Sequence, residues 1–599
     1  MLAQLKISGL LLLPFLILPF LFAQQNPVLK LDFEPGQLGT QIKGEVKELD
    51  FVEGIEGKAL ALGPEEGKKA LKLSGLSLDG SKDFTICFWM KADSDKPMVF
   101  LSQKIFGNKS ITTQKNPGWV IYSSGGSMAW SIGSGERRIN YERDNGSKMP
   151  INDGEWHQLA MSFKKELKEV RLYYDGGNVA VYKVNFDFSN EEILNIGAEV
   201  DSYSSRKFAA GIEQGKEELQ SLLDSFNALG LAPLKKEEFI ELIVNPEMLY
   251  EKKLAKRAGP EEQGNDVLGG VQSIRKNLLS NPYTVFQNRA LTDLKAVSQI
   301  YELQEGKVEI RESEGKLFTQ KEQLYPPDFS IDNLSIWDRV LDEKELEESY
   351  RILKKKKVKK LPKKRKELTI GVWNIWHGGI HWTKEKEGWD SRLRIVEMIR
   401  EKEIDVLLMQ ETYSSGDFIA AELGYYFATT SDWDYRYQGS NISVISRFPI
   451  KELQVSDKTE FNNVATRLAI SRTQEIWAMS NWYGMAQFGD VFSFHEERFE
   501  NSDHIPVFFG GDFNAVPHTD GGDSPASLKL SEAGFTEAFR NMYPDVEKYP
   551  GYTHRSASRI DQLYYKGKDL KNTHTEVNSS WPTGFPSDHY LIVSTFKLP

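Results

Sequence analysis

The chain has very little cysteine and no excess of positive charge. Its single cysteine, Cys87, excludes an internal disulfide framework and any metal site built from several cysteines. The formal net charge is −11, so no global basic field attracts nucleic acid. With 599 residues, the chain is long enough for several domains.

Long apolar runs are also missing, except near the N-terminus. Residues 9–22 are apolar and follow Lys6, but the run is short for a membrane span. With Ala23 as a cleavage point, the pattern predicts a secretory signal peptide over residues 1–23. Leu21 is a poor residue at the third position before the cut, which leaves an uncleaved anchor as the alternative. We expect a secreted or extracytoplasmic protein with no transmembrane span in the mature chain.

Short strands dominate from residue 28 to about residue 197. Aromatic and β-branched runs alternate there with Gly, Asp and Asn turns, which is typical of a β-sandwich or jelly roll. The stretches GIEGKALAL, DFTICFWMKAD, GEWHQLAMSF and RLYYDG, with the closing IDNLSIWDRVLDEKELEESY, resemble a laminin-G-like (concanavalin-like) jelly roll. The resemblance implies a domain over residues 28–352 that binds a glycan or a surface protein.

Two other segments have a different character. Between about residues 210 and 325, stretches such as EELQSLLDSFNAL have helical spacing of leucines, which predicts a helical insertion in the jelly roll. A separate small domain is the alternative. Residues 353–366, LKKKKVKKLPKKRK, predict an extended, solvated linker, or else a segment that binds an anionic surface or polymer.

From residue 367 onward strands alternate with helices, and polar residues stand where apolar strands end. Asn374 closes LTIGVWN, Glu411 follows IDVLLMQ, and Asp512 and Asn514 follow HIPVFFGG. A carboxylate at the end of a buried strand normally has a partner or a cation, and converging strand ends build active sites. Each of these residues alone has an alternative interpretation as a turn residue or an ion-pair partner.

The ordered fragments WN, QE, GDFN, RID and SDH resemble the endonuclease/exonuclease/phosphatase superfamily over residues 367–599. The resemblance implies a four-layer α/β sandwich of two mixed sheets and metal-dependent cleavage of a phosphate ester. The predicted fold is therefore multidomain: an all-β jelly-roll sandwich with a helical insertion, followed by a four-layer α/β sandwich.

The resemblance also implies a metal site. Glu411 would be the principal ligand of Mg²⁺, with Mn²⁺ as the alternative cation. Asn374 would lie beside it, and Asp588 would complete the metal surroundings. Mg²⁺ suits oxygen ligands of this kind because it prefers oxygen and keeps water, which leaves positions for the substrate phosphate.

The remaining residues of the matched fragments acquire catalytic roles by the same resemblance. Asp561 would orient the imidazole of His589 and stabilise its charged form. Asp512 would orient or deprotonate the attacking water, and Asn514 would hold a phosphoryl oxygen. Whether Asp512 or His589 takes the proton stays open.

One position departs from the family pattern. Many members carry a phosphate-contacting His after the strand that precedes GDFN, but this chain has Tyr483 there, in AMSNWYGMAQFGD. Tyr483 could donate a hydrogen bond to phosphate, His495 could fold in, or the role is lost. His377 in NIWHGG and Arg559 in YTHRSASRID are further candidate phosphate contacts, with a surface loop and local pairing as the alternatives.

The leading hypothesis is a secreted, Mg²⁺-dependent hydrolase of phosphate esters, either a phosphodiesterase or a phosphatase, with a jelly-roll binding module. Its substrate would be a small molecule, a lipid head group or a nucleic acid. A secreted nuclease is one alternative, although residues 367–599 show no broad basic face for a duplex. A non-catalytic protein that binds glycan or protein at a surface is the other, and the missing His favours it.

Overall fold

The structure is a computed structural model. It describes residues 26–35, 42–43, 49–63, 71–104, 117–141, 148–197, 310–319, 327–355, 361–379, 391–412, 415–430, 442–458, 462–482 and 487–599, apart from residues 74, 77, 136, 191–192 and 314–315. The predicted signal peptide lies outside these residues. No helix within the described ranges is long and apolar enough to cross a membrane.

The N-terminal domain is rich in β-structure, as the sequence predicts, and consists of two antiparallel sheets. One sheet has β13 (Gly177–Lys183), β12 (Glu169–Tyr174), β11 (His157–Lys164), β6 (Phe84–Lys91), β17 (Phe329–Trp337), β4 (Lys58–Leu62) and β3 (Asp50–Glu53), and β1 (Leu29–Leu31) pairs with β17. The other has β10 (Arg138–Tyr141), β9 (Ser127–Gly133), β8 (Gly118–Ser124), β7 (Met98–Ser102), β14 (Leu194–Ile196), β5 (Leu71–Leu73) and β2 (Ile42–Lys43). Aromatic side chains join the two sheets: the rings of Phe88 and Phe100 lie 6.4 Å apart, and both are fully buried.

Helix α6 (Glu343–Lys354) follows the last strand of this domain. It begins at Asp342, which forms a capping box with Glu345. Its buried Tyr350 stacks on Trp89 of β6, with ring centroids 5.4 Å apart. The helix therefore covers the outer face of one sheet, and Trp89 is a core residue.

Asp332 on β17 holds a loop of this domain in place. Its buried carboxylate accepts backbone hydrogen bonds from Ile55 (2.9 Å), Glu56 (3.3 Å) and Asn333 (2.7 Å). Because Asp332→Ala leaves three donors without this acceptor, we expect the free energy of unfolding to fall by about 3–5 kcal/mol. Chemical denaturation followed by tryptophan fluorescence would measure the loss. Asp338→Ala, in the turn after β17, is the control and should change little.

The C-terminal domain also contains two sheets. The first has β28 (Lys571–Asn578), β29 (Leu591–Lys597), β18 (Glu367–Asn374), β19 (Val406–Gln410), β21 (Ile442–Ser446) and β20 (Tyr426–Thr430). The second has β22 (Ile450–Gln454), β23 (Asn463–Ala469), β24 (Glu475–Trp482), β25 (Val507–Asp512), β27 (Asp561–Lys566) and β26 (Thr536–Glu537). The pairs β18–β19 and β24–β25 are parallel, so both sheets are mixed. Val372, Leu408, Phe508 and Leu563 belong to the apolar core between the sheets.

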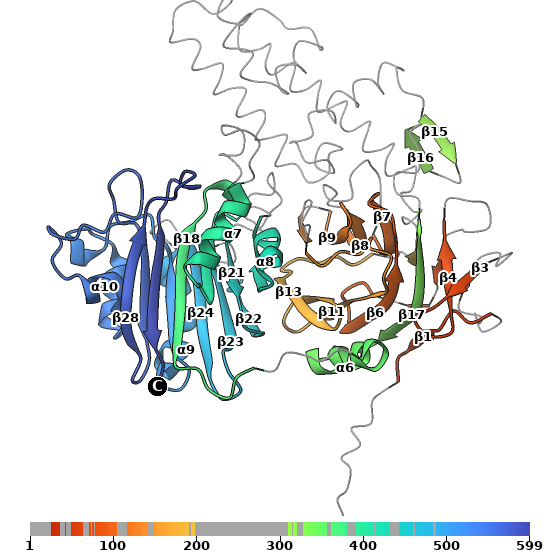
Figure 1. The fold of residues 1–599 in the computed structure, drawn as a ribbon, viewed down its shortest axis with the longest axis horizontal. Coiled ribbons are helices and arrows are strands. Elements are labelled where there is room, and N and C mark those ends of the chain that lie inside the picture. Colours follow the sequence, from red (N-terminus) through yellow and green to blue (C-terminus); the bar gives the residue numbers. More distant parts are fainter. Residues whose placement is uncertain are drawn as a thin grey trace, which may run out of the picture.

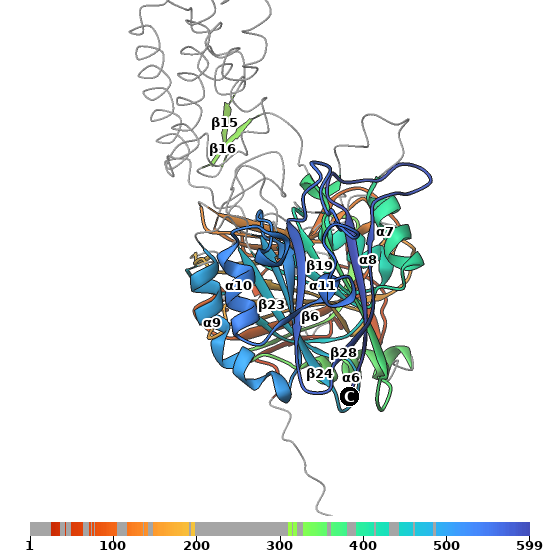
Figure 2. The ribbon, with the colours of Figure 1, turned by 90° about the vertical axis from the view of Figure 1, so that its left-hand side faces the viewer.

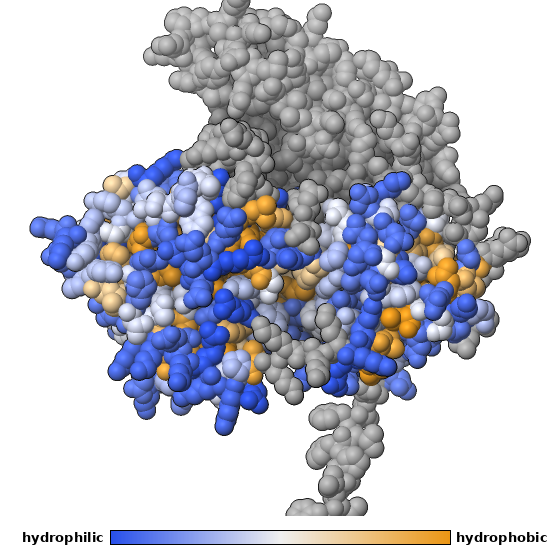
Figure 3. Space-filling model, in the orientation of Figure 1, coloured by the Kyte–Doolittle hydropathy of each residue, from blue (hydrophilic) through white to orange (hydrophobic). Residues whose placement is uncertain are grey.

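Helices cover the outer faces of these two sheets. Helices α7 (Ser391–Glu401) and α8 (Gly416–Leu423) lie on one side of the domain, and α9 (Phe488–Glu500) and α10 (Pro525–Glu532) lie on the other (Figure 2). Phe492 and Leu530 of the second pair pack against Phe509 of β25. Helix, sheet, sheet and helix therefore follow one another through the domain. The face of the domain seen in Figure 3 is mostly hydrophilic, with apolar residues in separate groups.

The two domains share one sheet. β13 of the jelly roll pairs in parallel with β20 of the C-terminal domain, from Ala180–Phe427 to Lys183–Thr430, so the two lie side by side (Figure 1). Arg171 reinforces the junction, since its guanidinium donates to the carbonyls of Ile450 (2.8 Å) and Lys451 (3.2 Å). The domains are thus joined through backbone pairing as well as through the basic segment.

The described end of that basic segment has a definite place on the C-terminal domain. The guanidinium of Arg365 pairs with Asp405 at 2.8 Å, and its backbone N–H donates to Gln474. Lys363 accepts a hydrogen bond from Thr473 through its carbonyl. Residues 361–366 therefore form an attached arm, whereas residues 356–360 lie outside the described residues.

Little of the predicted helical insertion is described. Within residues 210–325, the described part is an antiparallel hairpin of β15 (Ile310–Ser313) and β16 (Lys316–Thr319). This part of the insertion is therefore strand rather than helix. The stretches with helical spacing lie outside the described residues.

Candidate active site

The polar residues at the strand ends come from both sheets of the C-terminal domain and meet at one edge. Asn374 ends β18, and Glu411 comes directly after β19. Asp512 ends β25 and lies opposite Asp561, the first residue of β27. The ladder between β25 and β27 therefore places two carboxylates beside each other across the sheet.

Asn374 connects the two sheets. Its fully buried amide Nδ2 donates to Glu411 Oε1 and to Asp512 Oδ2, each at 3.1 Å. Its Oδ1 accepts a hydrogen bond from the backbone N–H of Trp376 at 3.0 Å. One side chain thus sets the distance between a carboxylate of the first sheet and a carboxylate of the second.

Glu411 lies at the opening of this edge. Its backbone adopts the left-handed conformation, with φ 54°, and its side chain is 14% exposed. Oε2 accepts a hydrogen bond from the backbone N–H of His377 at 3.0 Å, and the imidazole Nε2 of His377 lies 3.7 Å from the same oxygen. The structure therefore places His377 beside Glu411.

His589 and Asp561 form a buried pair. Nδ1 of His589 lies 2.9 Å and 3.1 Å from the two carboxylate oxygens of Asp561, which is fully buried. The backbone N–H of Asp561 donates to Thr553 Oγ1 at 2.9 Å. One ligand atom from each of Asp512, Asp561 and His589 lies within 4.8 Å of the other two.

This arrangement raises the pKa values of both Asp512 and His589, which favours the neutral form of the carboxyl and the charged form of the imidazole. Burial, together with the neighbouring Asp561 carboxylate, raises the pKa of Asp512 to about 7 and favours its protonated form. Burial lowers the pKa of His589, but the charge of Asp561 and its hydrogen bond outweigh burial and raise it to about 9. The charged imidazole is therefore the favoured form of His589 near neutral pH.

The shift of His589 predicts a pH-dependent stability of the metal-free protein. A folded-state pKa above the unfolded value of 6.5 adds stability that is complete below pH 6.5 and is lost as pH rises through 9. The free energy of unfolding in chelator should therefore fall by up to about 3 kcal/mol over that window. Urea denaturation at several pH values would measure it. The decrease should be smaller in His589→Gln, and an equal decrease in that variant would contradict the assignment.

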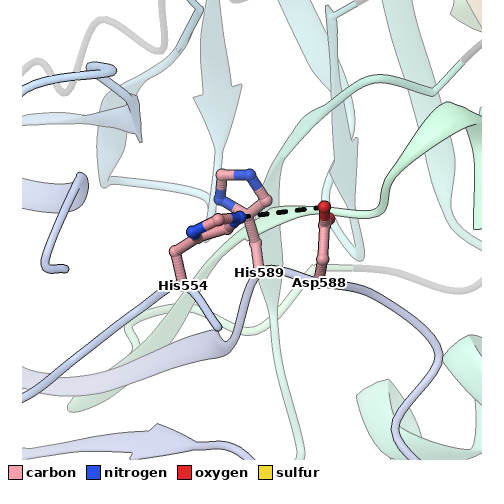
Figure 4. A group of neighbouring side chains, drawn as sticks. All are labelled: His554, Asp588 and His589. Carbon is pink, nitrogen blue, oxygen red and sulfur yellow. Dashed lines mark ion pairs between the residues drawn. The ribbon is translucent and has the colours of Figure 1, made fainter. Parts of the chain in front are cut away.

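Asp588 lies next to His589 and has an unsatisfied oxygen. Its side chain is 10% exposed, and its buried Oδ1 accepts no hydrogen bond from the described residues. Its Oδ2 lies 3.7 Å from His554 Nε2 (Figure 4). The same oxygen lies 3.7 Å from a guanidinium nitrogen of Arg555. His554 precedes the RID motif in the sequence, but its place beside His589 depends on the isolated β-bridge that pairs the two residues.

The donor set fits a hard divalent cation. Glu411, Asp588 and Asn374 supply carboxylate and amide oxygens, which are the ligands that Mg²⁺ prefers. The unsatisfied, buried Oδ1 of Asp588 is the observation in this structure that supports such a ligand. A bound cation would offset the negative charge that now makes Asp512 favour a proton.

Asn514 is among the residues that the structure describes, whereas Tyr483 is not. Asn514 is exposed, has the left-handed conformation with φ 49°, and donates its backbone N–H to Asp512 Oδ1 at 2.9 Å. It therefore lies next to Asp512 at the site. Tyr483 lies outside the described residues.

His495 and Arg559 are committed to other partners. His495 is fully buried, and its Nε2 lies 2.6 Å from Asn463 Oδ1, so it does not replace the missing phosphate-contacting His. Arg559 is 2% exposed and donates two hydrogen bonds to Asp520, at 2.7 Å and 2.8 Å, and one to Glu537 at 3.0 Å. Its guanidinium is occupied by carboxylates, which corrects the hypothesis of a phosphate contact in favour of local pairing.

Comparison with protein-family models gives two matches. Residues 371–589 match the Endonuclease/Exonuclease/phosphatase family, and residues 65–214 match the Concanavalin A-like lectin/glucanases superfamily. Both resemblances seen in the sequence are thus confirmed. Members of the first family are phosphoesterases and nucleases, and the site described above lies within the matched residues 371–589.

Individual relatives are distant. The catalytic domain of human Nocturnin has 19% sequence identity and a TM-score of 0.33, over 40% of this chain and 96% of that chain. Truncated TDP2 of Caenorhabditis elegans has 18% identity and a TM-score of 0.31, over 39% of this chain and 98% of that chain. An uncharacterized protein of Caenorhabditis elegans, F14F9.5, is 27% identical over 16% of this chain. The match spans 43% of that protein's length.

Proposed function

We propose that this chain is an exported, Mg²⁺-dependent phosphoesterase whose jelly-roll domain binds a glycan or a surface protein. One observation carries the catalytic part of the proposal. A continuous path of hydrogen bonds runs from Glu411 through Asn374 to Asp512, and Asp512 lies directly across the sheet from the Asp561–His589 pair. A purely structural role explains neither the buried carboxylate pair nor the unsatisfied oxygen of Asp588.

The cation would be held by Glu411, Asn374 and Asp588. A bound Mg²⁺ would supply Lewis-acid stabilisation of the charge on the phosphoryl oxygens. Asn374 also keeps Glu411 and Asp512 at a constant separation, because its amide donates to both. The substrate phosphate would therefore be presented to Asp512 in one orientation.

The neighbouring side chains position the attacking water and stabilise the charge that develops on the phosphate. Asp512 holds the attacking water. The proton of that water goes to Asp512, or to His589 in the fraction of molecules whose imidazole is neutral. Asp561 orients His589 through Nδ1 and favours the charged imidazole, which leaves Nε2 to face the reacting phosphate. Asn514 holds a phosphoryl oxygen next to Asp512.

The test is hydrolysis by the purified full chain, because β20 pairs with the jelly roll and the C-terminal domain has not been shown to fold alone. The panel is plasmid DNA, bis-p-nitrophenyl phosphate, sphingomyelin vesicles and inositol phosphates, each with Mg²⁺ and with chelator. We expect turnover of one class that requires Mg²⁺, stops in chelator and is absent from Asp512→Asn. The absence of turnover on every substrate, although Mg²⁺ still binds, would favour the non-catalytic alternative.

A cationic and aromatic pair at the rim suggests where the rest of the substrate binds. The guanidinium of Arg555 lies 5.3 Å from the ring centroid of Trp376, and its side chain is 59% exposed. Trp376 follows Asn374 closely, so this pair borders the metal site. Arg555→Ala should raise KM by about tenfold with little change in kcat, because an exposed contact to bound substrate is lost. Steady-state kinetics would measure both constants, and a loss confined to kcat would contradict this assignment.

Export is proposed from the apolar N-terminal segment, residues 9–22. Expression of the full gene in a secreting host should place the protein outside the cytoplasm and remove about 23 residues. N-terminal sequencing of the recovered protein would measure the cut. An intact N-terminus on exported protein would support the uncleaved anchor instead.

A further inference from the structure

Two side chains, His554 and Asp588, lie close to His589 of the catalytic pair and form a cluster with it. His554 and His589 face each other across an isolated β-bridge, with ring centroids 4.6 Å apart. Asp588 lies across from both rings (Figure 4). One ligand atom from each of the three residues lies within 4.8 Å of the other two. This cluster has two imidazoles and one carboxylate, whereas the Mg²⁺ donors proposed above are all oxygens.

The carboxylate of this cluster, which the Mg²⁺ site would share, has an oxygen without a partner among the described residues. Its side chain is nine-tenths buried, yet Oδ1 accepts no hydrogen bond from the described residues. Oδ2 is 3.7 Å from His554 Nε2, which is too long for a hydrogen bond. A buried carboxylate with one unsatisfied oxygen and one loosely paired oxygen is costly unless something else binds it.

Each imidazole also has a partner for its other nitrogen. Nδ1 of His589 is bonded to Asp561, so Nε2 is the nitrogen left for a ligand. Nδ1 of His554 lies 2.6 Å from Ser556 Oγ, which can accept its proton and leave Nε2 free to coordinate. In that tautomer Nδ1 cannot accept the 3.2 Å hydrogen bond from the backbone N–H of Ser556, so that hydrogen bond would be lost. A histidine ligand oriented in this way by a carboxylate or a hydroxyl is the usual arrangement at metal sites.

We propose that His554, Asp588 and His589 form a site for a borderline transition ion, Zn²⁺ in the first instance, which shares Asp588 with the Mg²⁺ site and differs from that site in its two imidazoles. Imidazole nitrogen with carboxylate oxygen suits Zn²⁺ and does not suit Mg²⁺. Three protein ligands leave a fourth position of the tetrahedron for water. His554 belongs to the turn between residues 554 and 558, which allows the small approach of ligands that a bound ion requires.

Occupation of this site inhibits hydrolysis, because the ion takes Nε2 of His589 and an oxygen of Asp588. This consequence rests on the proposed function, whereas zinc binding itself does not. The site therefore makes the enzyme sensitive to the ratio of Zn²⁺ to Mg²⁺ in its surroundings.

The experiment is a zinc titration of the chelator-stripped full chain, without substrate, by isothermal calorimetry. We expect one ion per chain at this site. His554→Ala should raise Kd at least about tenfold, since a ligand is lost. His554→Cys, which offers a thiolate, should restore binding. The control is His574→Ala, an exposed histidine on β28, which should leave Kd unchanged.

Circular dichroism of each variant would establish that it is folded. An unchanged Kd in folded His554→Ala, or the absence of zinc binding by the wild-type chain, would overturn the site. Zinc inhibition of Mg²⁺-dependent turnover is then measured in wild type and in His554→Ala. Loss of inhibition in the variant supports the proposal, and activation by zinc overturns its inhibitory part. If no substrate is ever turned over, the proposed function fails while the calorimetric result stands.

Discussion

His589→Ala is expected to lower kcat for phosphate-ester hydrolysis by about 10²–10⁴-fold. The imidazole is held by both oxygens of a fully buried Asp561 and borders Asp512, so no neighbouring group can move into its place without leaving Asp561 unpaired. Single-turnover kinetics with saturating Mg²⁺ would isolate the chemical step from product release. Asp512→Asn should cause a loss of similar size, because the amide keeps the shape of the side chain but cannot take a proton.

The matched control is His574→Ala, on the exposed face of β28. It removes the same side chain from the same domain and should leave kcat within about twofold of wild type. Wild-type rates in both His589→Ala and Asp512→Asn, on a substrate that the full chain turns over, would show that the chemistry occurs elsewhere. Loss in only one of the two would identify the residue that accepts the proton.

Glu411→Gln should raise the Mg²⁺ concentration for half-maximal activity by about 10–100-fold. The amide retains the shape of the side chain and one oxygen, which can accept a hydrogen bond from the His377 N–H or from Asn374 Nδ2 but not from both. It lacks the negative charge that a hard cation prefers. A Mg²⁺ titration of turnover, together with calorimetric titration of Mg²⁺ without substrate, would measure the change.

The control for this variant is Glu576→Gln, on β28, where the carboxylate pairs with Lys402 at 2.8 Å. It should leave the Mg²⁺ dependence unchanged. An unchanged Mg²⁺ titration in Glu411→Gln would exclude Glu411 as a principal ligand. Restoration of full activity at high Mg²⁺ is the expected signature of a weakened site, because the catalytic pair is intact.

The junction of the two domains restricts how the N-terminal domain can move relative to the candidate site. A module on a flexible linker would move independently, but β13 and β20 belong to one sheet and Arg171 donates across the junction. Edge strands that pair in this way are protected from other pairing. The jelly roll would therefore hold the active site at a constant orientation to whatever surface it binds.

The sequence by itself predicted the two kinds of domain and most of the residues at the candidate site. It could do so because the signals are local. Alternating strands with aromatic and β-branched residues identify the jelly roll, and an oxygen-bearing residue at the end of each buried strand marks the edge where ligands bind. Asn374, Glu411 and Asp512 were found in this way. Asp561 was assigned from the family resemblance, and the structure brings all four together.

Only the tertiary structure decided which of these side chains touch. That Asn374 joins Glu411 to Asp512, and that Asp561 lies opposite Asp512, follows from the register and packing of two sheets whose strands are far apart in the chain. Arg559 pairs with Asp520, 39 residues away, rather than with phosphate, because burial of a guanidinium requires carboxylates around it. His554 lies beside His589 because an isolated bridge pairs them, and the two domains share a sheet because β13 pairs with β20. Both pairings join residues that are far apart in the chain, so no pattern of neighbouring residues encodes them.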